Sequence, residues 1–462
     1  MIRNAGIALA ALLTLPAPLF AQEIQIGIGH QSQCTDTYAG GLVVKELHLL
    51  ERYLPHDGRY RTARYNVQWQ DYSSGPPITN MMLASKLQFG VMGDYPLIVN
   101  GAKFQETSTQ RSLYIAGTGY NLHGEGNGIV VPIHSNVYGL EDLKGKTVST
   151  PVGSASWGML LKALQGAKLT DSITIVNQSP PIGAANIDAG KIDAHADFCP
   201  WPELLEYRGS GRMIYHGSEA GVPYLHGIVV RKDFAAAYPE IVVAYLKAAL
   251  AAEQWIVQDP VRAATLMQQW SGIPKEVLYL YYGPGGVLTL DSTIKPRFVD
   301  ALKYDYQVLR KDNNISSLDF DQWIDDRYVR EAYKQMGLDY TKQLQTLIDP
   351  AQANVGLAPE VWVEGEGIRK FPSLSGLLAA VEPLRKAGKA ISATYVYDAG
   401  SGVKLFGSSA FYVRGADGSV SAFMLRTDAQ RFVAKNGGSI VDYSKSLAPS
   451  KLAASSAAAL RN

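Results

Sequence analysis

The sequence predicts an α/β protein with two similar lobes, followed by a small α+β module towards the C-terminal end. Three observations lead to this prediction. From residue 22 to about 345, strand-like runs alternate with helix-like patterns, as in layered α/β proteins. A block that begins near Leu140 repeats the strand–turn–helix design of the first half. From about 360 to 446 the strands are short and lie between turns, which indicates a separate module.

The first lobe opens with a predicted strand at 24–28, a helix at 38–53 and a strand at 65–72. The loop after the first strand has an unusual density of hydrogen-bonding side chains. Loops at the carboxyl ends of strands are where open sheets bind ligands. A polar surface loop that caps the next helix would explain the same residues. The candidate ligand residues in this loop are His30, Gln31, Ser32 and Asp36.

A helix, a buried strand and a tight corner follow between residues 72 and 96. The helix is expected to place Met81, Met82, Leu83 and Leu87 on one apolar face. Ser73 and Ser74 can cap this helix and leave free amides at its N-terminus, where the helix dipole favours an anion or a carboxylate. The strand at 89–92 ends in a Gly-Asp-Tyr-Pro corner, at the end where open α/β sheets bind ligands. We therefore predict ligand contacts from Ser73, Ser74, Gly75, Asp94 and Tyr95.

The second lobe repeats this design. A short helix near 140, a strand at 146–150 and a Gly-Ser turn lead into a helix over 159–164. Ser154, Ser156 and Trp157 precede that helix, so two helix N-termini are offered to one ligand. Trp157, and also Trp201 between two prolines, could stack on the ligand; core packing is the alternative for both, as it is for Tyr95.

Strands at 173–176 and 191–198 continue the second lobe. The strand period of two puts Asp193, His195, Asp197 and Cys199 on one side of the second of these strands, and Asp197 is a candidate ligand residue. A strand at 227–231 and a helix at 239–256 follow, and Asp259-Pro260 ends that helix.

The ends and the charge of the chain restrict its surroundings and partners. Residues 1–21 have Arg3, an apolar run at 7–15 and Ala21, which together are typical of a cleaved secretory signal. The run is too short to span a bilayer, so we expect a periplasmic protein without a membrane span in its mature form. Lys and Arg number 43 against 42 Asp and Glu, which gives no reason to expect a nucleic-acid partner. No G-x-S-x-G, H-E-x-x-H or P-loop motif occurs, so no enzymatic activity is predicted.

Four stretches of the sequence, taken in order, resemble a known family. They are SSGPPITNMMLASKLQFGVMGDYP, LKGKTVSTPVGSASWGMLLKAL, AGKIDAHADFCPWPELL and HGIVVRKDFAAAYPEIVVAYLKAALAAEQWIVQDPVRAA. The resemblance is to the periplasmic substrate-binding proteins of ABC importers, in the branch for nitrate, sulfonate, taurine and thiamine precursors. It implies a type II periplasmic-binding-protein fold over 22–350, with the first lobe at about 22–115 plus 225–345 and the second at about 116–224.

The same resemblance implies a function. The two lobes would close by a hinge motion over a small anionic or zwitterionic solute and deliver it to the membrane subunits of the importer. His226 matches the family position that often closes on the ligand, although a buried core histidine is the alternative. A monomer without a cofactor is the expectation for such a protein.

The C-terminal part follows a Pro-bearing linker at 351–359, and the Ala/Ser-rich end at 447–462 is predicted to be flexible. Strands are expected at 393–397, 410–413 and 421–425, and a helix from Thr427 that closes at Gly437-Gly438. Through AFMLRTDAQRFVAKNGGSIVDY, residues 360–446 resemble the copper-chaperone accessory proteins of nitrous oxide reductase. No Cys or His follows His226, so Met424 is the one soft donor that this stretch offers.

The two cysteines leave a second function open. Cys34 and Cys199 could form a disulfide in an oxidising compartment, or they could stay free. His30-x3-Cys34 and His195-x3-Cys199 are expected in opposing lobes and offer sulfur and imidazole to copper or zinc. The alternative hypothesis is therefore a periplasmic copper-handling protein, with His30, Cys34, His195 and Cys199 as ligands, that helps to load a copper enzyme.

Overall fold

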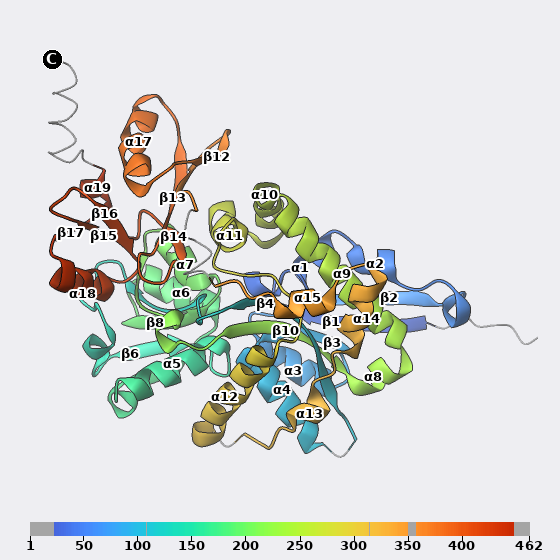
Figure 1. Cartoon of the computed structure of the whole chain (residues 1–462). Coiled ribbons are helices and arrows are strands. Elements are labelled where there is room, and N and C mark those ends of the chain that lie inside the picture. The colour runs from blue at the N-terminus through green and yellow to red at the C-terminus, as the bar shows by residue number, and fades with distance from the viewer. Residues whose placement is uncertain (1–22, 108, 314, 350–356, 448–462) are drawn as a thin grey trace, which may run out of the picture.

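The computed structural model describes residues 23–107, 109–313, 315–349 and 357–447. The predicted signal segment, most of the predicted linker and nearly all of the predicted tail lie outside the described residues. Two lobes, each built on its own sheet, lie side by side, and the C-terminal module packs at one end of them (Figure 1).

The sheet of the first lobe has five strands in the order β2-β1-β3-β10-β4. β1 pairs with β2 and β3 in parallel, whereas β10 runs antiparallel to both β3 and β4, so the sheet is mixed. Its strands are β1 (Glu23–His30), β2 (Arg64–Asp71), β3 (Phe89–Gly93), β4 (Ser112–Asn121) and β10 (Tyr224–Arg231). β3, β4 and β10 are buried along their whole length. β4 is an edge strand, but isolated bridges from Tyr114 to Ile324 and from Tyr120 to Thr289 cover its outer side.

The second lobe has the same kind of sheet, in the order β7-β6-β8-β5-β9. β6 is parallel to β7 and β8, and β5 is antiparallel to β8 and β9. The strands are β5 (Asn127–Pro132), β6 (Thr147–Thr150), β7 (Thr174–Asn177), β8 (Ala194–Phe198) and β9 (Gly211–His216). The repeated design predicted from the sequence is therefore present at the level of topology.

Two segments connect the lobes, and they lie side by side. One joins β4 to β5 and contains Gly124, which has a φ of +103°. The other joins β9 to β10 and begins at Gly217. A Cβ atom on Gly217 would overlap the carbonyl oxygen of Gly124, so the two backbones can approach this closely only with glycine. The two lobes are thus joined by a pair of closely packed crossings.

Helices cover both sheets (Figure 1). In the first part of the chain they are α1 (Leu42–Glu46), α2 (Leu49–Tyr53), α3 (Gly75–Leu83), α4 (Asp94–Glu106), α5 (Ala155–Gly166), α6 (Pro180–Asp188) and α7 (Trp201–Tyr207). After β10 come α8 (Lys232–Ala237), α9 (Pro239–Gln258), α10 (Pro260–Ser271), α11 (Lys275–Tyr282), α12 (Pro296–Asn313), α13 (Phe320–Trp323), α14 (Arg327–Gln335) and α15 (Tyr340–Gln345). Among the residues described, no helix combines the length and the apolarity needed to cross a bilayer.

Two local predictions were wrong. The helix expected at 38–53 is divided into α1 and α2, because His48 has a left-handed backbone with a φ of 50°. The helix after Ser74 ends at Leu83, so Leu87 is not part of it, and its buried side chains are Ile78, Thr79 and Met82. Periodicity alone did not show where these helices stop.

The C-terminal module contains two antiparallel sheets, ordered β12-β11-β13-β14 and β16-β15-β17. Its elements are β11 (Glu360–Val363), β12 (Gly367–Lys370), α17 (Leu374–Lys386), β13 (Ile391–Tyr397), β14 (Lys404–Phe406), β15 (Phe411–Arg414), β16 (Val420–Phe423), α18 (Arg426–Asn436), β17 (Ser439–Val441) and α19 (Tyr443–Ser446). The module packs on α7 and α11: the rings of Tyr207 and Phe406 lie 5.3 Å apart, and the Tyr395 hydroxyl donates to the Glu276 carbonyl at 3.0 Å.

Candidate functional site

The carboxyl ends of the parallel strands of both sheets meet where the lobes touch, and two thiols and an imidazole converge there. Cys34 follows β1 of the first lobe, Cys199 follows β8 of the second, and His226 lies on β10. The two Sγ atoms are 3.1 Å apart, and the His226 Nε2 atom lies 3.4 Å from Cys34 Sγ and 3.9 Å from Cys199 Sγ. All three side chains are at most 1% exposed. The cysteines are free thiols, 165 residues apart in the chain.

Polar side chains surround this cluster. The Tyr224 hydroxyl lies 3.0 Å from His226 Nε2 and 3.5 Å from Cys199 Sγ. On the other side of the imidazole, the Asp36 Oδ2 atom is 3.5 Å from His226 Nδ1. Asp36 is held in place because its carboxylate accepts hydrogen bonds from the Asn121 side chain at 2.7 Å and from the Thr35 hydroxyl at 2.9 Å. Contacts with Tyr224 and Asp36 therefore fix the orientation of the His226 ring beside the two thiols.

Burial dominates the electrostatics of the lobe contact. It lowers the pKa of His226 to about 3, raises the pKa of Asp36 to about 6 and raises that of Asp94 to about 7. The pKa values of both thiols are raised for the same reason. The imidazole is therefore neutral and the thiols are protonated at neutral pH, so the cluster itself carries no charge.

Glu203 of α7 provides a test of this burial. It is 5% exposed, accepts a hydrogen bond from the Tyr281 hydroxyl at 2.7 Å, and burial raises its pKa to about 7. From pH 4.5 to 7 the folded protein holds a proton there that the unfolded chain releases. As the pH rises from 4.5 to 7, the contribution of Glu203 should therefore lower the free energy of unfolding by about 3 kcal/mol. We expect E203Q to lose that part of the pH dependence in urea denaturation, whereas E141Q, at an exposed site, should keep it. Identical pH profiles of E203Q and the unaltered chain would contradict this.

A small cavity lies beside the cluster, behind Tyr224. It encloses about 30 Å³, enough for one water-sized group. Asp94, Lys162 and Asp305 bring titratable groups to its wall, and Asn127 lines it with an amide oxygen that has no hydrogen-bond partner among the described residues. Burial raises the pKa of the Asp305 carboxyl well above its usual value. Lys162 donates to the Ala220 carbonyl at 2.6 Å and lies over the Tyr304 ring. The wall of the cavity therefore offers one ammonium and two carboxyl groups.

The start of α5 forms the second-lobe side of this contact. Ser154 caps the helix by accepting from the Trp157 amide at 3.3 Å, and its hydroxyl lies 2.9 Å from that of Ser156. Trp157 packs against the core of the first lobe. Gly158 faces the ring of Tyr95 from α4, and a Cβ atom at Gly158 would overlap that ring. The lobes close here only because residue 158 has no side chain.

Several predicted ligand residues do not join the cluster. Ser73 is exposed, and Ser74 begins α3 without a side-chain capping bond, so the predicted serine cap is absent. Gly75 is buried against Pro96. Ser32 binds the Asp71 carboxylate at 2.5 Å, and Gln31 donates to the Val91 carbonyl.

The histidines of the predicted four-ligand metal set are also placed elsewhere. His30 packs edge-on against Trp69 with ring centroids 5.6 Å apart. His195 lies between Ser149 and Asp197, with 2.8 Å contacts to both. The carboxylate of Asp197, a predicted ligand residue, is therefore bound to a side chain of its own lobe. In their place, His226 lies beside the two thiols. Trp201 begins α7 and is 6% exposed within the core.

Sequence reasoning missed four residues of the site, which are Asn121, Lys162, Tyr224 and Asp305. Tyr224 is two residues before His226, and the strand period of two would have put both on one side. Asn121 lies in a Gly-rich stretch at the hinge, a sign of close backbone approach. Nothing local distinguishes Lys162 and Asp305 from exposed helix residues.

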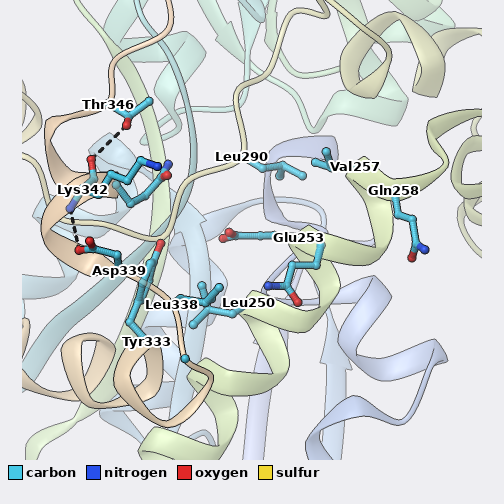
Figure 2. A pocket seen from close by; sticks show the side chains of 13 residues that line it. Leu250, Glu253, Val257, Gln258, Leu290, Tyr333, Leu338, Asp339, Lys342 and Thr346 are labelled. Carbon is cyan, nitrogen blue, oxygen red and sulfur yellow. Dashed lines mark hydrogen bonds between the residues drawn. The ribbon is translucent and has the colours of Figure 1, made fainter.

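A wider groove lies on the outer side of the first lobe, between α9 and α14–α15, with a volume of about 630 Å³. Figure 2 shows Glu253 of α9 opposite Asp339, Lys342 and Tyr333. The polar groups drawn there mostly hold α15: the Asp339 carboxylate accepts from the Lys342 amide, and Thr346 bonds to the Lys342 carbonyl. All residues that line this groove come from the first lobe, in α9, at Leu290 and from α14 to just after α15. The shape of the groove therefore does not depend on how closely the two lobes approach each other.

Comparisons with known proteins agree with this architecture. Residues 101–263 match the family model described as NMT1/THI5 like. The taurine-binding periplasmic protein of Escherichia coli (strain K12) is 31% identical over 199 residues, which are 42% of this chain and 58% of that protein. The chain thus spans somewhat over half the length of this relative.

Two solved structures share the fold of the two lobes. The alkanesulfonate-binding protein SsuA from Xanthomonas axonopodis pv. citri, bound to MOPS, has a TM-score of 0.56 and 21% identity, covering 66% of this chain and 100% of that one. A mutant of DSZB in complex with biphenyl-2-sulfinic acid has a TM-score of 0.51 and 14% identity, covering 68% and 99%. At these identities the likeness concerns the fold alone.

The two lobes therefore have the type II periplasmic-binding-protein fold with extra antiparallel sheets at the C-terminal end, and residues 101–263 have the sequence pattern of the NMT1/THI5-like family.

Proposed function

We propose that this protein is the periplasmic solute-binding component of an ABC importer and has no enzymatic activity. The observation that carries the proposal is the lobe contact: the carboxyl ends of both sheets meet, and polar groups of both lobes line one cavity there. The paired crossings at Gly124 and Gly217 supply a hinge. A solute that touches both lobes would stabilise the closed form, which the membrane subunits of the importer would then recognise.

A zwitterion of the taurine type is the solute class that the cavity favours. Such a solute has a sulfonate at one end and an ammonium at the other. Lys162 can meet the negative end, and Asp94 and Asp305 can meet the positive end. The taurine-binding relative from Escherichia coli supports the same class. Because the cavity now holds only about 30 Å³, the lobes must part slightly about the hinge to admit it.

The role of Lys162 gives the first test. We expect the purified chain to bind taurine in isothermal titration calorimetry, and K162M to bind it roughly 30-fold or more weakly, because an ion pair to a buried charge is lost. K144M, which removes an exposed lysine of the same lobe, should bind taurine normally. Absence of binding to taurine and to short alkanesulfonates would refute the solute class. Equal affinities of K162M and K144M would refute the role of Lys162.

The C-terminal module keeps its resemblance to the copper-chaperone proteins as a prediction. Met424 is 9% exposed and lines a groove between the module and the lobes, together with His123 and His216. The groove has a volume of about 360 Å³. Docking of a partner protein at the module is the alternative explanation of its fusion to the receptor.

A further inference from the structure

The cluster at the lobe contact has the composition of a metal site. Cys34, Cys199 and His226 each offer one ligand atom, and these atoms all lie within 4.8 Å of one another. Among the residues described, they form the one group of three or more His, Cys, Asp or Glu ligands that meets this criterion. We propose that Cys34, Cys199 and His226 bind a single Cu(I) ion that connects the two lobes. The site is separate from the proposed solute cavity, because Tyr224 lies between the two.

The distances suit one ion after a small adjustment. With metal–sulfur bonds of about 2.3 Å and metal–nitrogen bonds of about 2.0 Å, the ligand atoms of a trigonal site are roughly 3.7–4.0 Å apart. The two distances from His226 Nε2, 3.4 and 3.9 Å, are already close to this range. The sulfur atoms, 3.1 Å apart, must separate by about 1 Å, which side-chain rotation of the cysteines can supply.

The ligand set and its burial favour Cu(I) over zinc. Thiolate ligands select Cu(I) and zinc among the common metals. Structural zinc sites use four ligands, whereas this group contains three, and catalytic zinc keeps a solvent position. Here the ligands are at most 1% exposed, so a fourth ligand from solvent has little access. A three-coordinate site that excludes water and offers two sulfur atoms and one nitrogen atom matches a soft monovalent ion.

Neighbouring groups orient the ligands as metal sites require. A metal-binding imidazole commonly donates its other ring N–H to a carboxylate. In this protein Nε2 of His226 faces the thiols and the Tyr224 hydroxyl, whose 3.0 Å contact the metal would replace. Nδ1 lies 3.5 Å from Asp36 and has no closer hydrogen-bond partner among the described residues. A slight rotation of the ring would complete that bond. Asp36 is therefore a positioning residue.

Binding requires no redox step. The two thiol protons leave to solvent, two Cu–S bonds and one Cu–N bond form, and copper stays Cu(I). One sulfur comes from each lobe, so the site is complete only in the closed form. Copper loading should therefore favour closure.

The experiment is an anaerobic titration of the reduced, full mature chain with Cu(I) in the presence of bicinchoninate as a competing chelator. We expect one equivalent of Cu(I) to be withdrawn per chain, and X-ray absorption to show two sulfur neighbours and one nitrogen neighbour. C34S, C199S and H226Q should each lower the affinity by about 100-fold or more, and D36N by roughly 10- to 100-fold.

Matched controls are H30Q and H195Q, which remove the other two buried histidines considered for this site and should leave Cu(I) affinity unchanged. Thermal unfolding and taurine titration of every variant check that the chain is folded, and they report on the proposed transport function independently of copper. A Cys34–Cys199 disulfide in protein isolated from the periplasm, unchanged Cu(I) affinity in C34S, or stronger binding of Zn(II) than of Cu(I) would overturn the assignment.

Discussion

Replacing Gly158 with alanine is expected to hold the two lobes apart. The ring of Tyr95 occupies the position that the new Cβ would take, and the two residues belong to opposite lobes. Within α5 alone, alanine is a better helix former than glycine, so the second lobe should fold at least as well. The substitution should therefore destabilise the contact between the lobes and not the fold of the second lobe. Overpacking a close contact costs about 1–3 kcal/mol, which corresponds to a roughly 5- to 150-fold loss of affinity for any ligand held between the lobes.

The measurement combines ligand affinity with shape. G158A should bind taurine and Cu(I) more weakly and have a larger radius of gyration in small-angle X-ray scattering. G166A, at the end of the same helix, is the control, because no atom of the described residues lies within 4 Å of the position its Cβ would take. A G158A variant that binds as tightly as G166A would show that the contact between Tyr95 and Gly158 does not limit closure.

The second large effect is expected at the junction with the C-terminal module. Lys404 Nζ donates to Glu360 Oε2 at 2.7 Å, with side chains 0% and 2% exposed. Glu360 also accepts from the Tyr279 hydroxyl of α11 at 3.1 Å, so the pair lies against the lobes. Burial lowers the pKa of Lys404 to about 8. Removing one partner leaves a charge buried without its counter-ion, and K404M should cost about 3–5 kcal/mol of the free energy of unfolding.

A double-mutant cycle separates charge from packing. The double variant E360Q/K404M removes both charges and should be markedly more stable than K404M alone, as measured by urea denaturation followed through tryptophan fluorescence. K389M breaks the exposed pair between Lys389 and Glu366 and should change stability by less than about 1 kcal/mol. If K404M and K389M change the free energy of unfolding by the same small amount, the Lys404–Glu360 ion pair does not stabilise the packing of the module on the lobes. The same contacts mean that deleting the module would expose the α11 surface around Tyr279 and Glu276.

The sequence alone determined the order and type of many elements, because hydrophobic periodicity and turn residues act locally, but the predictions did not include β4, β5 and β9. The strand at 24–28, the helix that begins near Pro239 and the stop at Asp259-Pro260 all have their counterparts in β1, α9 and the start of α10. The repeated strand–turn–Ser–helix pattern also indicated two lobes of one design. Local capping was less reliable: Ser154 caps α5, whereas Ser74 makes no side-chain bond before α3.

Only the tertiary structure decided which of the polar residues meet. Cys34 and Cys199 are 165 residues apart, and their contact depends on how two separately folded sheets face each other across the hinge. The sequence placed both cysteines beside histidines a few residues away, yet His30 and His195 are held by Trp69 and by Ser149 and Asp197. Instead, His226 lies beside the thiols, on β10, the strand with which the chain returns to the first lobe. Periodicity within a strand determines the face of the sheet on which a side chain lies. The way in which the lobes pack against each other determines which side chains it contacts there.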